Sequence, residues 1–103
     1  MLRSVGYRSV AEKGEDPRLA GLRVAVARLR RDLAGHQNEF RDRGIAEEEL
    51  AALAAMAAGG DPEVQRMRRS LLLIVGSIGS VSALVPTLMD LREAVDLFGG
   101  SRR

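Results

Sequence analysis

The sequence contains no cysteine and no tryptophan, and it has only one histidine, one tyrosine and two phenylalanines. Without cysteine, disulfide bonds and thiolate metal sites are excluded. So few aromatic side chains leave little for stacking on nucleic-acid bases. The single histidine, His36, has no nucleophile or orienting acid at a recognisable spacing, as base catalysis would require. We therefore expect no catalytic residue, no metal site and no cofactor.

The charge is nearly balanced, with 16 basic and 14 acidic residues, and this balance does not favour nucleic-acid binding. The two signs are segregated along the chain. Residues 1–43 carry ten basic and six acidic side chains, 44–65 carry five acidic and no basic ones, and 66–103 carry six basic and three acidic ones. Opposite blocks of this kind attract one another within a fold or between subunits.

Helical signals place one domain at 16–99, between a flexible basic arm at 1–15 and a short tail at 100–103. Asp16-Pro17 predicts the start of a first helix, because the aspartate caps free amides and proline suits the first helical position. A second helix is expected over about 45–58, where three consecutive glutamates favour the positive end of the helix dipole.

The strongest periodic signal follows Asp61-Pro62, which predicts the start of a third helix. Large apolar residues recur there at steps of three and four, so they share one helical face. Pro86 lies inside this pattern and disfavours helical geometry at the preceding residue, so the helix should be kinked or broken near it. We expect an all-α fold, a small antiparallel bundle of three main helices. The predicted self-association seam consists of Leu71, Ile74, Ile78, Val81, Val85 and Leu88.

The first helix has a seam of its own at the same spacing, which consists of Leu19, Leu22, Val26, Leu29 and Leu33. Oligomer formation is expected because the chain carries two long seams and is too short to cover both. The third helix also has a thin side at which another helix can approach closely. This predicted close-packing side consists of Gly76, Gly79, Ser80 and Ala83.

Residues 70–89 contain no charged side chain, and this allows two interpretations. Twenty such residues can cross a bilayer as one helix, and the arginines before them would keep the N-terminus inside, in an inner-membrane protein. Alternatively, the segment is the central helix of a soluble bundle, apolar on most sides because neighbours surround it. The soluble interpretation is favoured because the first two helices have no other apolar surface to pack on.

Three arginines, Arg66, Arg68 and Arg69, precede the uncharged stretch. Their guanidinium groups are suited to an anionic partner, which is one interpretation of the cluster. The other is surface pairing with the acidic residues 47–49, which a short Gly-Gly turn can fold back against them. The second interpretation is favoured.

Three stretches resemble a small family of uncharacterised actinobacterial proteins, and the likeness covers most of the chain after residue 15. They read DPRLAGLRVAVARLRRDLAGH, EEELAALAAM and RMRRSLLLIVGSIGSVSALV. The glycine, serine and alanine pattern of the third helix also resembles C-terminal segments of effector-associated domains in bacterial conflict systems. The family resemblance implies no activity, because the family has no assigned activity or site residues. The second resemblance implies an adaptor or assembly module and not an enzyme.

The sequence therefore predicts a non-enzymatic helical interaction module, acting as an adaptor, scaffold or regulatory subunit in the cytoplasm. Its expected partners are further copies of itself and an unidentified protein. The alternative is a single-pass membrane protein with its span at 70–89 and a cytoplasmic helical hairpin. Nucleic-acid binding is the least favoured function.

Overall fold

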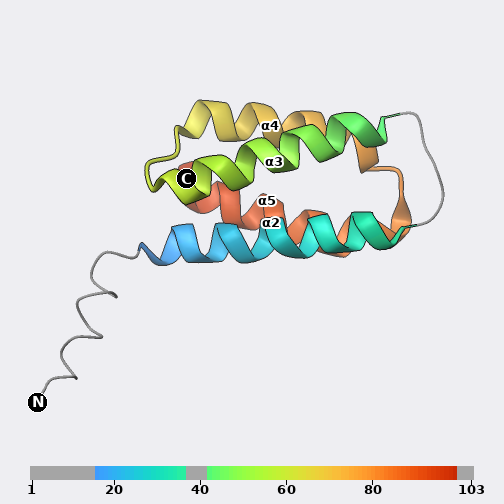
Figure 1. Ribbon diagram of the computed structural model, residues 1–103, viewed down its shortest axis with the longest axis horizontal. Coiled ribbons are helices and arrows are strands. Elements are labelled where there is room, and N and C mark those ends of the chain that lie inside the picture. The colour runs from blue at the N-terminus through green and yellow to red at the C-terminus, as the bar shows by residue number, and fades with distance from the viewer. Residues whose placement is uncertain (1–15, 37–41, 100–103) are drawn as a thin grey trace, which may run out of the picture.

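The computed structural model describes residues 16–36 and 42–99, and the predicted arm and tail lie outside them. In this part of the chain the fold is all-helical. Each helix packs on the next, and α5 returns to α2, so the helices form an up-down-up-down bundle (Figure 1). The elements are α2 (Pro17–Gly35), α3 (Arg43–Gly59), α4 (Val64–Ile78), the short 3-10 helix η1 (Ser82–Leu84) and α5 (Val85–Gly99).

Capping explains where α2 begins and where α3 ends. Asp16 accepts a hydrogen bond from the backbone amide of Arg18 at 2.9 Å, and Pro17 occupies the first helical position, as predicted. α3 ends at Gly59, and its C-cap residue Gly60 has a left-handed φ of +82°, which suits glycine. The start of α4 differs from the prediction. It begins at Val64, and its N-cap residue Glu63 makes no capping side-chain hydrogen bond.

All four helices contribute to a single core. α2 supplies the leucine face that its spacing predicts, and α3 supplies two leucines between alanines that allow close packing. Two further apolar faces come from α4 and from η1 with α5. The largest fully buried side chains are Leu22, Val26, Leu29, Leu33, Leu50, Leu53, Met67, Ile74, Ile78, Leu84, Leu91 and Val95.

The predicted third helix is in fact two helices, so the bundle formed by residues 16–36 and 42–99 has four main helices and not three. α4 ends at Ile78, and the chain reverses before α5 begins. A Cβ atom at Gly79 would lie 2.5 Å from the carbonyl oxygen of Val75, which makes glycine the suitable residue at this helix end. Val81 then adopts an extended conformation. The break therefore precedes Pro86, which lies in the first turn of α5, where a missing amide donor costs little.

The division of residues 70–89 among α4, η1 and α5 also bears on the membrane alternative. No helix in the described ranges combines the length and apolar character needed to cross a bilayer. A single span over 70–89 is therefore not supported.

Candidate interaction surface

The apolar seam predicted for self-association lies mainly inside the monomer. Ile74 and Ile78 are fully buried, and Leu71 and Leu88 are nearly so. Val81 packs partly against the same core, whereas Val85 is exposed at the start of α5. The buried members already pack within the core of their own chain, so they present no surface to a second copy.

The small residues predicted to form a close-packing side are on the surface but do not share one helix. Gly76 belongs to α4, and Gly79 is the C-cap residue after it. Ser80 lies in the following turn and Ala83 in η1. All four are exposed. A Cβ at Gly76 would meet no atom within 4 Å, so a helix from another chain could approach α4 there.

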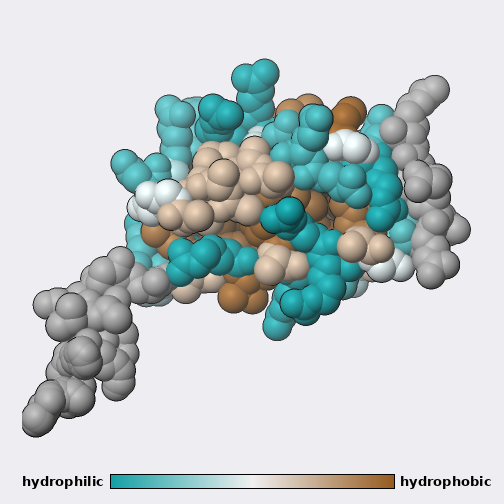
Figure 2. Space-filling model, in the orientation of Figure 1, coloured by the Kyte–Doolittle hydropathy of each residue, from teal (hydrophilic) through white to brown (hydrophobic). Residues whose placement is uncertain are grey.

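Large hydrophobic side chains are exposed around the C-terminal half of α4. Leu72 is 71% exposed, and hydrophobic residues on both flanking helices are also on the surface. Figure 2 shows brown side chains along the upper edge of the molecule, over this half of α4, whereas the nearer surface of α3 is tan. We call this set the α4 apolar surface, and it consists of Ile45, Leu72, Leu73, Val75, Val85 and Met89.

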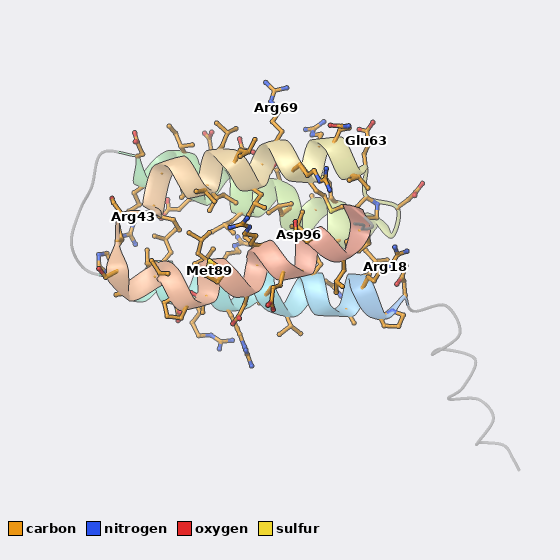
Figure 3. The ribbon with its side chains drawn as sticks, turned by 180° about the vertical axis from the view of Figure 1, so that it is seen from behind. Arg18, Arg43, Glu63, Arg69, Met89 and Asp96 are labelled. Carbon is orange, nitrogen blue, oxygen red and sulfur yellow. The ribbon has the colours of Figure 1, made fainter. Side chains whose placement is uncertain are left out.

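The packing of α4 on its neighbours explains why residues from three helices meet here. The Ser70 hydroxyl donates a hydrogen bond of 2.8 Å to Glu49 Oε1. This bond shows which residues of α3 and α4 lie side by side along the two helix axes. Ile45 lies one turn before Glu49, so in an antiparallel pair it stands level with the turn after Ser70. On the opposite flank α4 packs on α5, and Figure 3 shows Met89 on the surface that these two helices form.

The three arginines before the uncharged stretch differ in their surroundings. The Arg68 guanidinium lies against Gly99 at the C-terminal end of α5, where the partial negative charge of the helix dipole is concentrated. Arg66 and Arg69 are exposed, and Figure 3 shows Arg69 projecting away from the bundle. Within the described residues neither forms an ion pair. The predicted pairing with residues 47–49 is therefore not formed there.

The glutamates of α3 have other partners. Glu49 accepts the hydrogen bond from Ser70, and Glu47 forms an ion pair of 3.2 Å with Arg43. Arg43 also donates to the backbone carbonyl oxygens of His36, at 2.9 Å, and Leu33, at 2.5 Å. It thus adds a side-chain donor at the end of α2, where the Leu33 carbonyl also accepts a hydrogen bond of 3.1 Å from the His36 amide. The sequence did not point to this contact, because the cap comes from the next helix.

A cluster of polar and aromatic groups ties α2 to α5 at the end of the bundle where α2 begins. The Arg18 guanidinium donates to both carboxylate oxygens of Asp16, at 2.8 Å and 3.2 Å, and lies 4.8 Å from the centre of the Phe98 ring. Hydrogen bonds from the Arg18 side chain and then from its backbone amide lower the pKa of Asp16. The same side-chain bonds raise the pKa of Arg18.

A second surface lies between α2 and α5, where an open groove encloses about 940 Å³. Val24 from α2 and Leu97 from α5 expose apolar side chains on it. Asp90 and Glu93 also line it, so the α5 side is acidic. We call this the α2–α5 groove. Sequence reasoning missed it, although the spacing of these α5 residues, at steps of three and four, places them on one helical side.

The sequence matches a family of unknown function, DUF5955, over residues 11–99. The chain belongs to this family. The DUF5955 match spans every helix of the bundle, from before α2 to the end of α5. No curated protein and no solved structure shows significant similarity to this DUF5955 chain. The expected likeness to an uncharacterised family is thus confirmed, while its actinobacterial character and the likeness to conflict-system domains stay predictions.

Proposed function

We propose that this DUF5955 chain is a non-enzymatic helical interaction module that self-associates through the α4 apolar surface. One observation carries the proposal. Of the eight large hydrophobic side chains exposed in the described ranges, six belong to this surface. Single exposed hydrophobics are ordinary, but contiguous apolar patches mark interaction sites on soluble proteins.

The energetics favour a weak to moderate association. Burying an exposed leucine fully contributes about 1.5–3 kcal/mol, whereas association costs at least about 4 kcal/mol in lost translational and rotational freedom. Several of the six side chains must therefore be buried together. The open space outside Gly76 favours the contact, because a partner helix can approach α4 closely one turn after Leu72. A dissociation constant in the micromolar range, which corresponds to about 8 kcal/mol, is a reasonable expectation.

Self-association suits an adaptor, a scaffold or a regulatory subunit, because it brings together the partner proteins bound to each copy. In this proposal the module works in the cytoplasm and binds further copies of itself and another protein. The buried seam contributes stability to each copy, and the α4 apolar surface contributes the contact between copies.

The test is the solution mass of the full chain, measured by light scattering after size exclusion over a wide range of concentrations. The wild type is compared with Leu72→Asp, which places a charge at the most exposed position of the α4 apolar surface. The matched control is Ala27→Asp, which adds the same charge at an exposed position of α2 outside that surface.

We expect the wild type and Ala27→Asp to exceed the single-chain mass of 11.1 kDa at micromolar concentration. Leu72→Asp should stay at that mass, with an unchanged helical circular dichroism spectrum. A wild type that remains at 11.1 kDa at every concentration would contradict self-association. A Leu72→Asp variant that assembles like the wild type would show that another surface makes the contact.

A further inference from the structure

We propose that the α4 apolar surface binds the α2–α5 groove of a second copy, so that the chain assembles head to tail. This inference rests on the proposed self-association and names the counter-surface that α4 recognises. It is carried by the spacing of charged and apolar residues on two exposed helix sides.

One side of α4 carries Arg66, Arg69 and Leu73, spaced by three and four residues. One side of α5 carries Asp90, Glu93 and Leu97 at the same spacing and with the opposite charge. All six side chains are exposed. Steps of three and four keep each set on a single helical side.

When the two helices are parallel and aligned at this register, each residue of the α4 set lies opposite one residue of the α5 set. Arg66 then lies opposite Asp90 and Arg69 opposite Glu93, and the leucines Leu73 and Leu97 meet one turn further on. Arg66, Arg69, Asp90 and Glu93 form no ion pair within the described part of the chain, so all four charges are available for such a contact.

The shape of the groove also suits a helix that presents leucines. Val24 is exposed beside the α5 residues and offers an apolar contact to Leu72, which neighbours Leu73. On the α2 side the small residues Ala20, Gly21 and Ala25 line the groove together with Val24 and Arg28, and a Cβ at Gly21 would meet no atom within 4 Å. The groove therefore has room for side chains from another helix.

A symmetric contact between two copies of α4 would pair fewer charged side chains than the head-to-tail contact. Centred on Leu72 and Leu73, an antiparallel pair would place Arg69 opposite Gly76 and Arg66 opposite Gly79. Residues 70–79 carry no charge, so that arrangement gives the arginines no carboxylate on the facing helix. In the head-to-tail arrangement the charges select the orientation, which is the usual contribution of exposed ion pairs at interfaces.

The surface on α4 and the groove between α2 and α5 are different parts of one copy. Each copy can therefore use its α4 on one neighbour and its groove on another. Such a contact leads to a closed ring or an open chain, depending on the rotation between neighbours, and not to an obligatory dimer.

The experiment reverses the charges on each side separately in the full chain. The basic-side variant carries Arg66→Glu and Arg69→Glu, and the acidic-side variant carries Asp90→Arg and Glu93→Arg. Light scattering should show loss of assembly to the mass of one chain for each variant alone. An equal mixture should recover assembly, because every mixed contact again joins arginine to a carboxylate. The chain with all four substitutions should recover it as well.

Single apolar substitutions give a second readout that does not depend on charge reversal. Leu73→Asp leaves the groove intact, and Leu97→Asp leaves α4 intact, so each alone should be monomeric. Their mixture should form only a pair of one copy of each, because no second contact is possible.

The outcomes separate the two proposals. If the wild type assembles and the acidic-side variant or Leu97→Asp assembles equally well, the groove is not the counter-surface, and self-association through α4 still stands. If both reversed variants are monomeric but their mixture does not recover assembly, the head-to-tail pairing is overturned. A wild type that never assembles overturns the proposed function together with this inference.

Discussion

At the scale of single residues, burial separates two side chains that the sequence alone treats alike. Ile78 and Leu72 are aliphatic residues of one uncharged stretch, yet Ile78 is fully buried and Leu72 is 71% exposed. The reason is the position of α4 between α3 and α5. Its inward side meets the core, and no described helix covers its outward side.

This difference predicts opposite results for the same substitution. Ile78→Asp places an unpaired carboxylate in the core and should cost roughly 3–5 kcal/mol, a large part of the 5–15 kcal/mol typical of a domain. Leu72→Asp leaves its charge in water and should keep the melting temperature of a dilute sample unchanged. Thermal unfolding monitored by circular dichroism measures the melting temperatures of both variants and of the wild type. An Ile78→Asp variant that melts like the wild type would show that this side of α4 is not in the core.

Asp16 provides a prediction on pH. Its folded-state pKa lies below the ordinary value of 3.8 because Arg18 donates hydrogen bonds to it. A carboxyl with a lowered folded pKa stabilises the fold above its unfolded pKa, and that contribution is lost as the pH falls through the folded value. The melting temperature of Asp16→Ala should therefore lie below that of the wild type at pH 7, and the gap should narrow below about pH 3.8.

Arg18→Gln is the matched variant for this measurement. It removes the guanidinium that bonds the carboxylate but leaves the backbone amide of residue 18 available to the cap. Its stability should vary with acid less than that of the wild type. A gap between wild type and Asp16→Ala that stays constant from pH 7 to pH 2 would contradict the role given to the ionised carboxylate.

At the scale of helices, local signals predicted α2 and α3 well and the reversal after α4 poorly. The Asp-Pro start and the leucine spacing are sufficient for α2, because both act within a few residues. The apolar spacing continues across the break, since Leu84 and Leu88 face the same core as Ile74 and Ile78. Periodicity therefore could not reveal that the chain turns back between them.

The candidate surface was predictable only in part for a related reason. The sequence identified the uncharged stretch and the small residues, but which hydrophobic side is covered depends on where α5 packs. Once α5 is a separate helix that returns along α4, it buries Ile74 and Ile78 with the rest of the core and leaves Leu72 and Leu73 outside. Which side of α4 is buried depends on tertiary packing, and no local sequence pattern specifies that packing.

Two glycines in the helical framework should respond oppositely to alanine. Gly60 has a φ of +82°, which costs a residue with a Cβ about 1–2 kcal/mol, so Gly60→Ala should destabilise the fold by roughly that amount. Gly21 lies within α2 with open space around a Cβ, so Gly21→Ala should stabilise it by about 0.5–1 kcal/mol. Urea unfolding of both variants measures the difference, and equal shifts in the same direction would contradict these backbone assignments.

At the scale of the whole molecule, the case for assembly rests on a different surface from the one that the sequence suggested. The argument from two uncovered seams loses its force, because the fourth helix covers them within one copy. What remains exposed is a basic and apolar side of α4 and an acidic and apolar groove between α2 and α5. Both charged sides, Arg66 and Arg69 on α4 and Asp90 and Glu93 on α5, come from residues 66–103, so the acidic block at 44–65 does not supply the groove.

Assembly of folded chains should make stability depend on protein concentration. Association that involves only the folded state adds to its stability by mass action, so the melting temperature should rise as the wild type is concentrated above its dissociation constant. The rise should be smaller at high salt, because ion pairs such as those proposed for Arg66 and Arg69 are screened over about 3 Å at 1 M ionic strength. Leu72→Asp should show no rise, and Ala27→Asp should follow the wild type. Calorimetry over a hundredfold range of concentration measures this, and a wild-type melting temperature that does not change would mean that the folded chain gains nothing from a second copy.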